Sequence, residues 1–170
     1  LQKIFKSKIK DTDFLVSWEW TKMEQTASRL IRNAGSWYMH SFVHHGYTNY
    51  GEVLGAGIGP GSNSQYFSVS KIKKFDKIGI SLEIIDQDND YFYYAFEDAQ
   101  DYRRYWKDYN LHLNYDKKFN NIWVSANFIY SRSLNYQWEL DDFAKPYYHS
   151  GFDTNNFHST LKIIYEIPIN

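Results

Sequence analysis

The chain of 170 residues contains no cysteine, few prolines and no long apolar run. The absence of cysteine excludes a disulfide framework and a thiolate metal site. No stretch approaches the roughly 18 apolar residues of a membrane-spanning helix. Basic and acidic side chains nearly balance, with a formal net charge of −1, so the charge gives no indication of the basic face that nucleic acid requires. We therefore expect no nucleic-acid partner.

Aromatic side chains are abundant, at 20% of the residues, and they alternate with polar ones in several segments. The strongest alternation runs from Ile122 to Leu140, and its apolar face is interrupted only at Arg132. It follows a second strict alternation at residues 108–116 and the turn-forming pair Asn120-Asn121, so the two runs predict a β-hairpin. Further strands are predicted at residues 14–20, 37–45, 64–72, 78–84 and 157–167, and an eighth at 3–9.

The lengths of the connections favour a membrane barrel over a soluble sheet. If the last strand ends on the periplasmic side, Asn120-Asn121 and residues 73–76 are short periplasmic turns, and residues 46–63, 89–107 and 141–156 are long extracellular loops. This asymmetry is typical of outer-membrane barrels. Two connections fit less well, because residues 26–35 are long for a turn and residues 10–13 are short for a loop.

These patterns predict an all-β fold, an antiparallel transmembrane β-barrel of the outer-membrane type. Seven or eight strands without further pairing would leave two open edges, which membranes do not tolerate. The chain opens at Leu1 without a methionine or a signal pattern. We therefore interpret residues 1–170 as the C-terminal part of a single larger barrel domain that is monomeric when full length and contacts outer-membrane lipid.

Six of the nine glycines lie between Gly46 and Gly61, which indicates a long loop with special backbone angles or close approaches. The glycines match neither a P-loop nor the dinucleotide-binding fingerprint. Between them stand Tyr47, Asn49 and Tyr50. We interpret the run as a structural loop folded over or into the barrel mouth, and we predict no cofactor.

Acidic and histidine residues offer weaker candidates. Asp86, Asp88 and Asp90 have the spacing of a calcium loop, but Tyr91 stands where that loop needs glycine. We read them as a solvated acidic strand end, and a calcium ion bridging the loops stays an open alternative. His40 and His44 share a predicted strand face without an identified third metal ligand. Carboxylate pairs for glycoside cleavage, drawn from Glu52, Glu83, Glu97 or Asp98, carry no specific signal, so no metal or catalytic residue is predicted.

The long loops are the best candidates for binding. Aromatic rings stack on the apolar faces of sugars, and arginine or lysine pairs with uronate or phosphate groups. An aromatic girdle at the membrane surface with loop packing is the alternative explanation. A short helix is also predicted at residues 96–108. The candidate polysaccharide-binding residues are Tyr47, Asn49, Tyr50, Tyr102, Arg103, Arg104, Trp106, Lys145, Tyr147 and Tyr148.

The amino-acid sequences of several segments resemble those of the capsule assembly Wzi family of outer-membrane proteins. The resemblance covers most of the chain but not its last residues, where Glu166 to Asn170 replace the terminal aromatic common in such barrels. It is carried by His44-His45-Gly46-Tyr47-Thr48-Asn49, Gly51-Glu52-Val53-Leu54-Gly55-Ala56-Gly57-Ile58-Gly59-Pro60-Gly61-Ser62-Asn63-Ser64-Gln65, Trp37-Tyr38-x-His40, Asp88-Asn89-Asp90-Tyr91, Asn135-Tyr136-Gln137-Trp138 and Asn155-x-Phe157-His158.

The resemblance implies a closed outer-membrane barrel of the bacterial cell that helps attach capsular polysaccharide to the surface, as a lectin and not as an enzyme. The expected partner is a capsular or other acidic polysaccharide. Two alternatives remain at this point: a transport or assembly channel that acts through its lumen, lined by residues such as Glu83 and Asn127, and a polysaccharide-cleaving enzyme.

Overall fold

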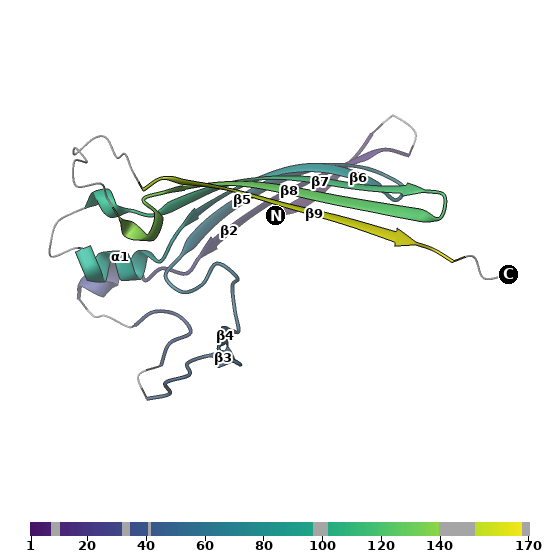
Figure 1. Cartoon of the computed structure of the whole chain (residues 1–170). Helices are drawn as coiled ribbons and strands as arrows, with labels where there is room; N and C mark the ends of the chain where they lie inside the picture. The colour runs from purple at the N-terminus through teal and green to yellow at the C-terminus, as the bar shows by residue number, and fades with distance from the viewer. Residues whose placement is uncertain (8–10, 32–34, 41, 97–101, 140–151, 168–170) are drawn as a thin grey trace.

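The computed structural model describes residues 1–7, 11–31, 35–40, 42–96, 102–139 and 152–167. Its main feature is one antiparallel sheet of seven strands (Figure 1), which confirms the all-β prediction. Each strand pairs with its neighbour in the order β1-β2-β5-β6-β7-β8-β9. The strands are β1 (Gln2–Lys6), β2 (Asp13–Lys22), β5 (Asn63–Lys73), β6 (Asp76–Asp86), β7 (Lys107–Phe119), β8 (Ile122–Leu134) and β9 (Thr154–Tyr165).

Smaller elements lie in the connections. A two-stranded hairpin, β3 (Thr48–Asn49) with β4 (Glu52–Val53), stands between β2 and β5, after the short helix η1 (Ala27–Leu30). The β6–β7 connection holds α1 (Asn89–Phe96) and η2 (Tyr102–Arg104), and η3 (Tyr136–Trp138) follows β8. No helix among the described residues has the length and apolar character needed to cross a membrane.

The strand predicted at residues 37–45 is absent, and that prediction was wrong. The His40 ring accepts hydrogen bonds from the backbone N–H groups of Phe42 and Val43, each at 3.2 Å. These donors are therefore not available for a strand ladder. Tyr38 has a φ of 66°, outside the strand region. The chain passes from β2 to β5 through one long connection, so His40 and His44 do not share a strand face.

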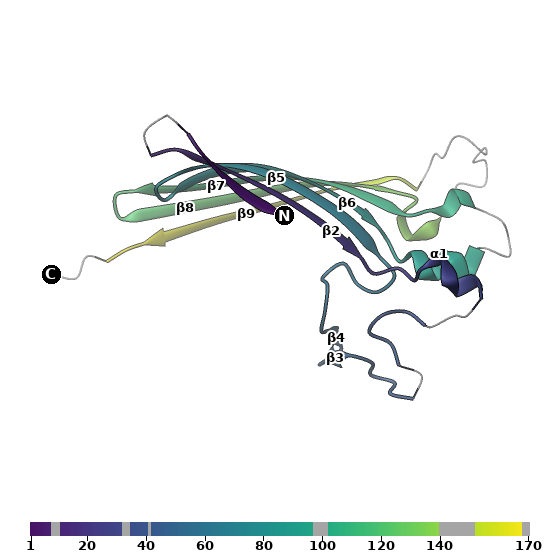
Figure 2. The ribbon, with the colours of Figure 1, turned by 180° about the vertical axis from the view of Figure 1, so that it is seen from behind.

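Because residues 37–45 do not form a strand, the two connections that fitted the barrel asymmetry poorly are now explained. The β1–β2, β5–β6 and β7–β8 connections are all short and lie at one end of the sheet, and the three long connections lie at the other (Figures 1 and 2). Residues 26–35 belong to the long β2–β5 connection, and the short stretch at residues 10–13 belongs to the end with the turns. The length asymmetry therefore holds for every connection in the sheet.

Two other predicted boundaries differ from the structure. The run predicted as one strand to Leu140 ends at Leu134, because Asn135 has a φ of 51° and η3 follows. Asparagine tolerates this left-handed conformation better than most residues. The helix predicted at residues 96–108 is displaced toward the N-terminus as α1, and Asp88 Oδ1 accepts the Tyr91 N–H at 3.0 Å in its first turn.

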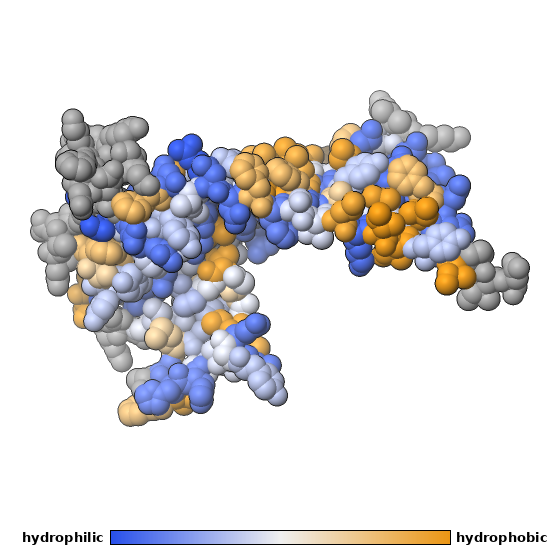
Figure 3. Space-filling model, viewed as in Figure 1, coloured by the Kyte–Doolittle hydropathy of each residue, from blue (hydrophilic) through white to orange (hydrophobic). Residues whose placement is uncertain are grey.

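The two faces of the sheet differ sharply in polarity. One level across six strands carries apolar side chains only: Trp18, Phe67, Leu82, Leu111, Tyr130 and Phe157. On the opposite face the neighbouring level carries Glu19, Tyr66, Glu83, Asn110, Ser131 and Asn156. Hydrophobic residues gather over the strands, most densely toward the end of β9 (Figure 3).

No described residues form a layer over the apolar face. Leu82 in the centre of the sheet is 54% exposed, and Phe157 is 65% exposed. Among the described residues Phe92 of α1 is the only buried apolar side chain. The sheet arches with the β3–β4 hairpin on its concave side in both views (Figures 1 and 2). The apolar face is therefore not part of a core within the described chain.

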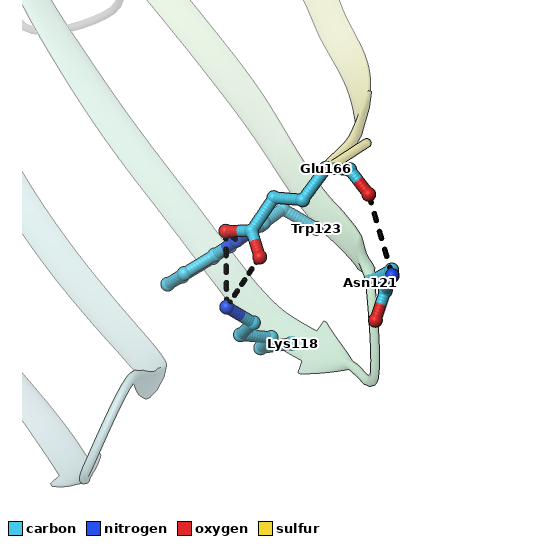
Figure 4. Close-up of polar contacts among 4 residues, drawn as sticks. All are labelled: Lys118, Asn121, Trp123 and Glu166. Atoms are coloured by element: carbon cyan, nitrogen blue, oxygen red, sulfur yellow. Dashed lines mark hydrogen bonds and ion pairs between the residues drawn. The ribbon is translucent and has the colours of Figure 1, made fainter. Parts of the chain in front are cut away.

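The last strand is fastened to the β7–β8 turn by Glu166 (Figure 4). Its two carboxylate oxygens accept hydrogen bonds from Lys118 Nζ at 2.9 and 2.8 Å, and one also accepts the Trp123 indole N–H at 2.6 Å. The Glu166 N–H donates to the carbonyl of Asn121 at 2.7 Å. The hydrogen bonds from Lys118 and then from Trp123 hold the pKa of Glu166 below its ordinary value of 4.5.

We predict that this end of β9 loosens in acid. Because the folded pKa is lowered, the stabilisation is present above pH 4.5 and is lost as the pH falls through the folded pKa. We expect the protection factors of the backbone amides of residues 162–166, measured by hydrogen exchange, to fall as the pH drops through the folded pKa of Glu166. Glu166→Gln should show low protection at all pH values and Glu52→Gln, in β4, should behave as the unsubstituted protein. A Glu166→Gln profile that keeps the full pH dependence would contradict the assignment.

Candidate functional site at the end with the long connections

Aromatic side chains of α1, η2 and η3 form a cap at the end with the long connections. Phe92 is 2% exposed and packs edge-on against Tyr105, with ring centroids 4.9 Å apart. Tyr91 contacts Trp138 at 4.6 Å. Burial raises the pKa of the Tyr105 hydroxyl well above its ordinary value, so this group stays protonated. The cap is a small core of aromatic rings, whereas the described part of the sheet buries no apolar side chain.

Two predicted site residues are used inside this cap. Trp106 donates its indole N–H to Asp108 Oδ1 at 2.8 Å and packs edge-on against Trp138, with ring centroids 5.0 Å apart. Arg104 donates to the carbonyl of Trp138 at 3.0 Å and lies over the Phe96 ring. Both side chains hold η2 and η3 together, which is the loop-packing alternative raised from the sequence.

Three other predicted residues lie in the β3–β4 hairpin and are exposed. Tyr50 and Gly51 form its two-residue turn with φ values of 49° and 86°, and the Tyr50 side chain is fully exposed. Tyr47, 64% exposed, lines an apolar hollow of about 440 Å³ together with Trp37 and His40. Trp37 is 58% exposed and was not predicted as a site residue; an indole in a glycine-rich polar connection was the available signal.

The predicted residues therefore do not form one site. Tyr47, Asn49 and Tyr50 belong to the hairpin, which lies apart from α1 in both views (Figures 1 and 2). Tyr102, Arg103 and Arg104 form η2 next to β7. Lys145, Tyr147 and Tyr148 lie outside the described residues.

The glycines of the long connection accommodate Tyr38. A Cβ at Gly55 would overlap the Tyr38 ring, and one at Gly46 would overlap the Tyr38 carbonyl oxygen. The Tyr38 hydroxyl accepts the Ala56 N–H at 3.0 Å, and its carbonyl accepts the Tyr47 N–H at 2.8 Å. The run is therefore a loop closed around one tyrosine, in agreement with the predicted structural role.

A polar cleft lies where this loop crosses the polar face of the sheet. Its volume is about 590 Å³, and Ala56, Gly57 and Ile58 form one wall. The other walls come from β2, β5, β6 and Gln87, among them Glu19, Tyr66 and Glu83. Glu83 accepts a hydrogen bond from Asn110 at 3.2 Å.

A basic notch lies on the opposite, apolar face at the same end. Its volume is about 410 Å³, and its lining includes the cations Arg103, Lys107 and Arg132, with Asp153 and the buried Asn135. Lys107 pairs with Asp86 at 2.9 Å, and Arg132 pairs with Asp153 at 3.3 Å. Sequence reasoning placed Arg103 in a sugar site and noted Arg132 only as an interruption.

Asp86, Asp88 and Asp90, which have the spacing of a calcium loop, hold the connections together and are not a solvated strand end. Asp86 pairs with Lys107, Asp88 bonds to the first turn of α1, and Asp90 accepts the Gln25 N–H at 2.9 Å. Burial raises the pKa of Asp88, and the charge of Asp90 adds to this. The described residues contain no group of three or more acidic or histidine side chains placed to hold one metal ion.

Glu24 joins the same network from the β2–β5 connection. It pairs with Lys22 at 2.8 Å and accepts the Asn89 amide N–H at 2.6 Å. Although burial alone raises the pKa of Glu24, these hydrogen bonds outweigh it and hold the pKa below its ordinary value. Of the carboxylates that the sequence offers for sugar cleavage, Glu52 lies in the hairpin, and Glu97 and Asp98 lie outside the described residues. Glu83 lies in the polar cleft.

Comparisons with known proteins identify no relative: no protein-family model, curated protein or solved structure matches this chain. The resemblance of its motifs to the capsule assembly Wzi family stays a prediction.

We predict that Gly55→Ala opens the long connection and that Gly57→Ala does not, because a Cβ at Gly57 meets nothing within 4 Å. Displacing Tyr38 breaks its bond to Ala56, which costs about 1 kcal/mol, or roughly a fivefold larger open population. Limited chymotryptic cleavage after Tyr47 and Tyr50 should accelerate by about that factor. Equal cleavage rates for the two variants would show that Tyr38 does not organise the loop.

Proposed function

We propose that this chain is the C-terminal part of an outer-membrane β-barrel that binds a capsular or other acidic polysaccharide at the cell surface without catalysis. The first support is the sheet itself, with one apolar uncovered face, one polar face and every long connection at the same end. An outward apolar band, a polar interior and long extracellular loops are the usual features of such barrels.

The height of the apolar band fits a bilayer. On β6 the residues Ile78, Ile80, Leu82 and Ile84 lie on the apolar face between Asp76 and Asp86. The distance between these aspartates is roughly 33 Å at about 3.3 Å per residue. At the usual tilt of about 40° it spans roughly 25 Å along the membrane normal, the height of the apolar band in such barrels.

The strand directions indicate how the barrel closes. Every pairing in the sheet is antiparallel, so the first and last of its seven strands, β1 and β9, run in the same direction. Outer-membrane barrels pair all strands antiparallel. We therefore infer that an odd number of further strands closes the barrel between β1 and β9, which agrees with an even total.

The exposed aromatic hollow beside the hairpin is the observation that carries the binding proposal. Trp37 and Tyr47 present exposed rings beside His40, and Tyr50 projects at the tip of the neighbouring turn. Apolar sugar faces stack on exposed aromatic rings. Trp106 and Arg104 are taken up in cap packing, so we place the sugar contacts at the hairpin. The acidic character of the glycan rests on the basic residues predicted from the sequence, Lys145 among them.

The test is glycan binding by the complete protein, purified in a neutral detergent. We expect the double variant Trp37→Ala/Tyr47→Ala to lose at least tenfold in affinity for a uronate-containing polysaccharide, because two stacking contacts are worth roughly 1 kcal/mol each. Phe42→Ala is the matched control, since Phe42 is 88% exposed in the same connection and does not line the hollow.

Two results would reject the binding proposal. The first is the absence of any retained acidic glycan on an array, together with intact capsule attachment after deletion of the protein. The second is an equal loss of affinity in the Phe42→Ala variant and in the double variant, which would indicate a general effect on the connection.

The polar cleft supports a second candidate function, a transport or assembly channel. The cleft lies on the face that would form the lumen, and the loop at Ala56–Ile58 partly covers it. Carboxylates at a constriction attract cations and repel anions, and Glu19 and Glu83 both line this cleft.

For that channel we expect Glu83→Gln to lower the preference for cations in planar bilayers, and Asn127→Ala, farther along the polar face, to change it less. Removing the residues of the covering loop should raise the conductance. A protein that conducts no ions with or without the loop would rule out a channel and leave the binding proposal unaffected.

A further inference from the structure

Arg132 interrupts an otherwise apolar face of β8. Its neighbours at the same level are Tyr109 of β7 and Asn155 of β9, and Leu111, Tyr130 and Phe157 form the apolar level directly below. One level above, Lys107 pairs with Leu134 in the register. A cation costs least at the edge of an apolar band, where its head group reaches the polar boundary. Arg132 therefore marks the edge of the band.

Lys107 of β7 and Arg132 of β8, the two strand cations, line the basic notch of about 410 Å³ together with Arg103. Tyr105 and Leu134 also line the notch. Three cationic side chains line the notch, and two of them are paired with a carboxylate: Lys107 with Asp86 and Arg132 with Asp153.

The strand cations retain capacity for a ligand. Arg132 makes one hydrogen bond of 3.3 Å to Asp153, and its side chain is 54% exposed. A guanidinium has five N–H donors, so a single long bond leaves most of them for an anion. Lys107 has one ion pair with Asp86 and a ring contact with Tyr105.

Asn135 fixes the shape of the notch. Its side chain is buried and donates to the carbonyl oxygens of Arg103 and Tyr105 at 2.8 and 3.0 Å. Its N–H donates to Asp153 Oδ1 at 3.4 Å. One residue thus ties the backbone of η2 to the end of β8 and to the carboxylate that holds Arg132, so the cations are positioned before any ligand arrives.

We propose that this notch binds the phosphate head group of an anionic membrane lipid whose acyl chains lie along the apolar face below it. Charge-assisted hydrogen bonds from arginine and lysine suit phosphate oxygens. The exposed apolar level at Leu111, Tyr130 and Phe157 begins immediately beside the notch, where a lipid with its phosphate in the notch would place its chains. The proposal rests on the barrel orientation proposed above and assigns these cations to lipid instead of polysaccharide.

The test uses the complete protein in dodecyl maltoside with added phosphatidic acid, and phosphatidylcholine as the zwitterionic reference. Native mass spectrometry counts the bound lipids. We expect Arg132→Gln and Lys107→Gln each to weaken phosphatidic acid binding about tenfold, the usual effect of removing one charge-assisted hydrogen bond. Arg132→Lys should retain more of the affinity than Arg132→Gln.

Lys117→Gln is the matched control. Lys117 lies on the same strand and face as Lys107, at the other end of the band, and it also pairs with an aspartate of β6, Asp76, at 3.4 Å. The affinity of the Lys117→Gln variant for phosphatidic acid should stay within about twofold of that of the unsubstituted protein. Phosphatidylcholine binding should be the same for all variants.

Three results would overturn the proposal. Unchanged phosphatidic acid binding in both notch variants would remove the site, and an equal loss in Lys117→Gln would reduce it to general electrostatic attraction. Displacement of the lipid by an equal concentration of inorganic phosphate would show a phosphate site without a lipid requirement.

Glycan affinity measured on the same preparations separates this proposal from the proposed function. If the notch variants lose lipid binding and no variant binds glycan, only the polysaccharide proposal is rejected. Normal lipid binding by the notch variants, with glycan lost in Trp37→Ala/Tyr47→Ala, would reject only the lipid site.

Discussion

The structure depends on one constraint, a single-layer sheet whose apolar face is left uncovered by the described residues. The described residues bury one apolar side chain, Phe92, and it lies in the cap and not on the sheet. Hydrophobic burial is the main favourable contribution to folding in water, and an antiparallel sheet normally covers one face with a second layer. In the barrel proposed above, lipid covers this face.

At the end with the long connections, polar contacts join the β2–β5 connection to α1, beside the aromatic cap that packs α1, η2 and η3. Glu24, Ser62, Asn89 and Asp90 link the β2–β5 connection to the start of α1 through hydrogen bonds. Ser62, Asn89 and Asp90 are buried, so these contacts are largely removed from water. Buried polar groups are costly unless they are paired, so this network fixes a particular loop arrangement.

Much of the sheet was predictable from the sequence, because its faces differ at every second residue. The predictions at residues 64–72, 78–84 and 108–116 each fall within an observed strand, and Asn120-Asn121 forms the expected turn. The prediction at residues 37–45 failed because the alternation of residue types does not show that the His40 ring accepts hydrogen bonds from nearby backbone N–H groups. The end of β8 was missed for a similar reason, since the left-handed conformation of Asn135 depends on carbonyl partners about 30 residues away.

The candidate sites were less predictable, because composition does not tell which side of a sheet a loop residue reaches. Trp37 and Tyr47 share a hollow in the connection that crosses the polar face, whereas Arg103 joins Arg132 on the apolar face. The hollow at the hairpin and the basic notch therefore lie on opposite sides of the sheet. The aromatic and basic residues that the sequence groups as one binding set therefore lie apart in the structure, and we propose a different ligand for the hairpin and for the notch.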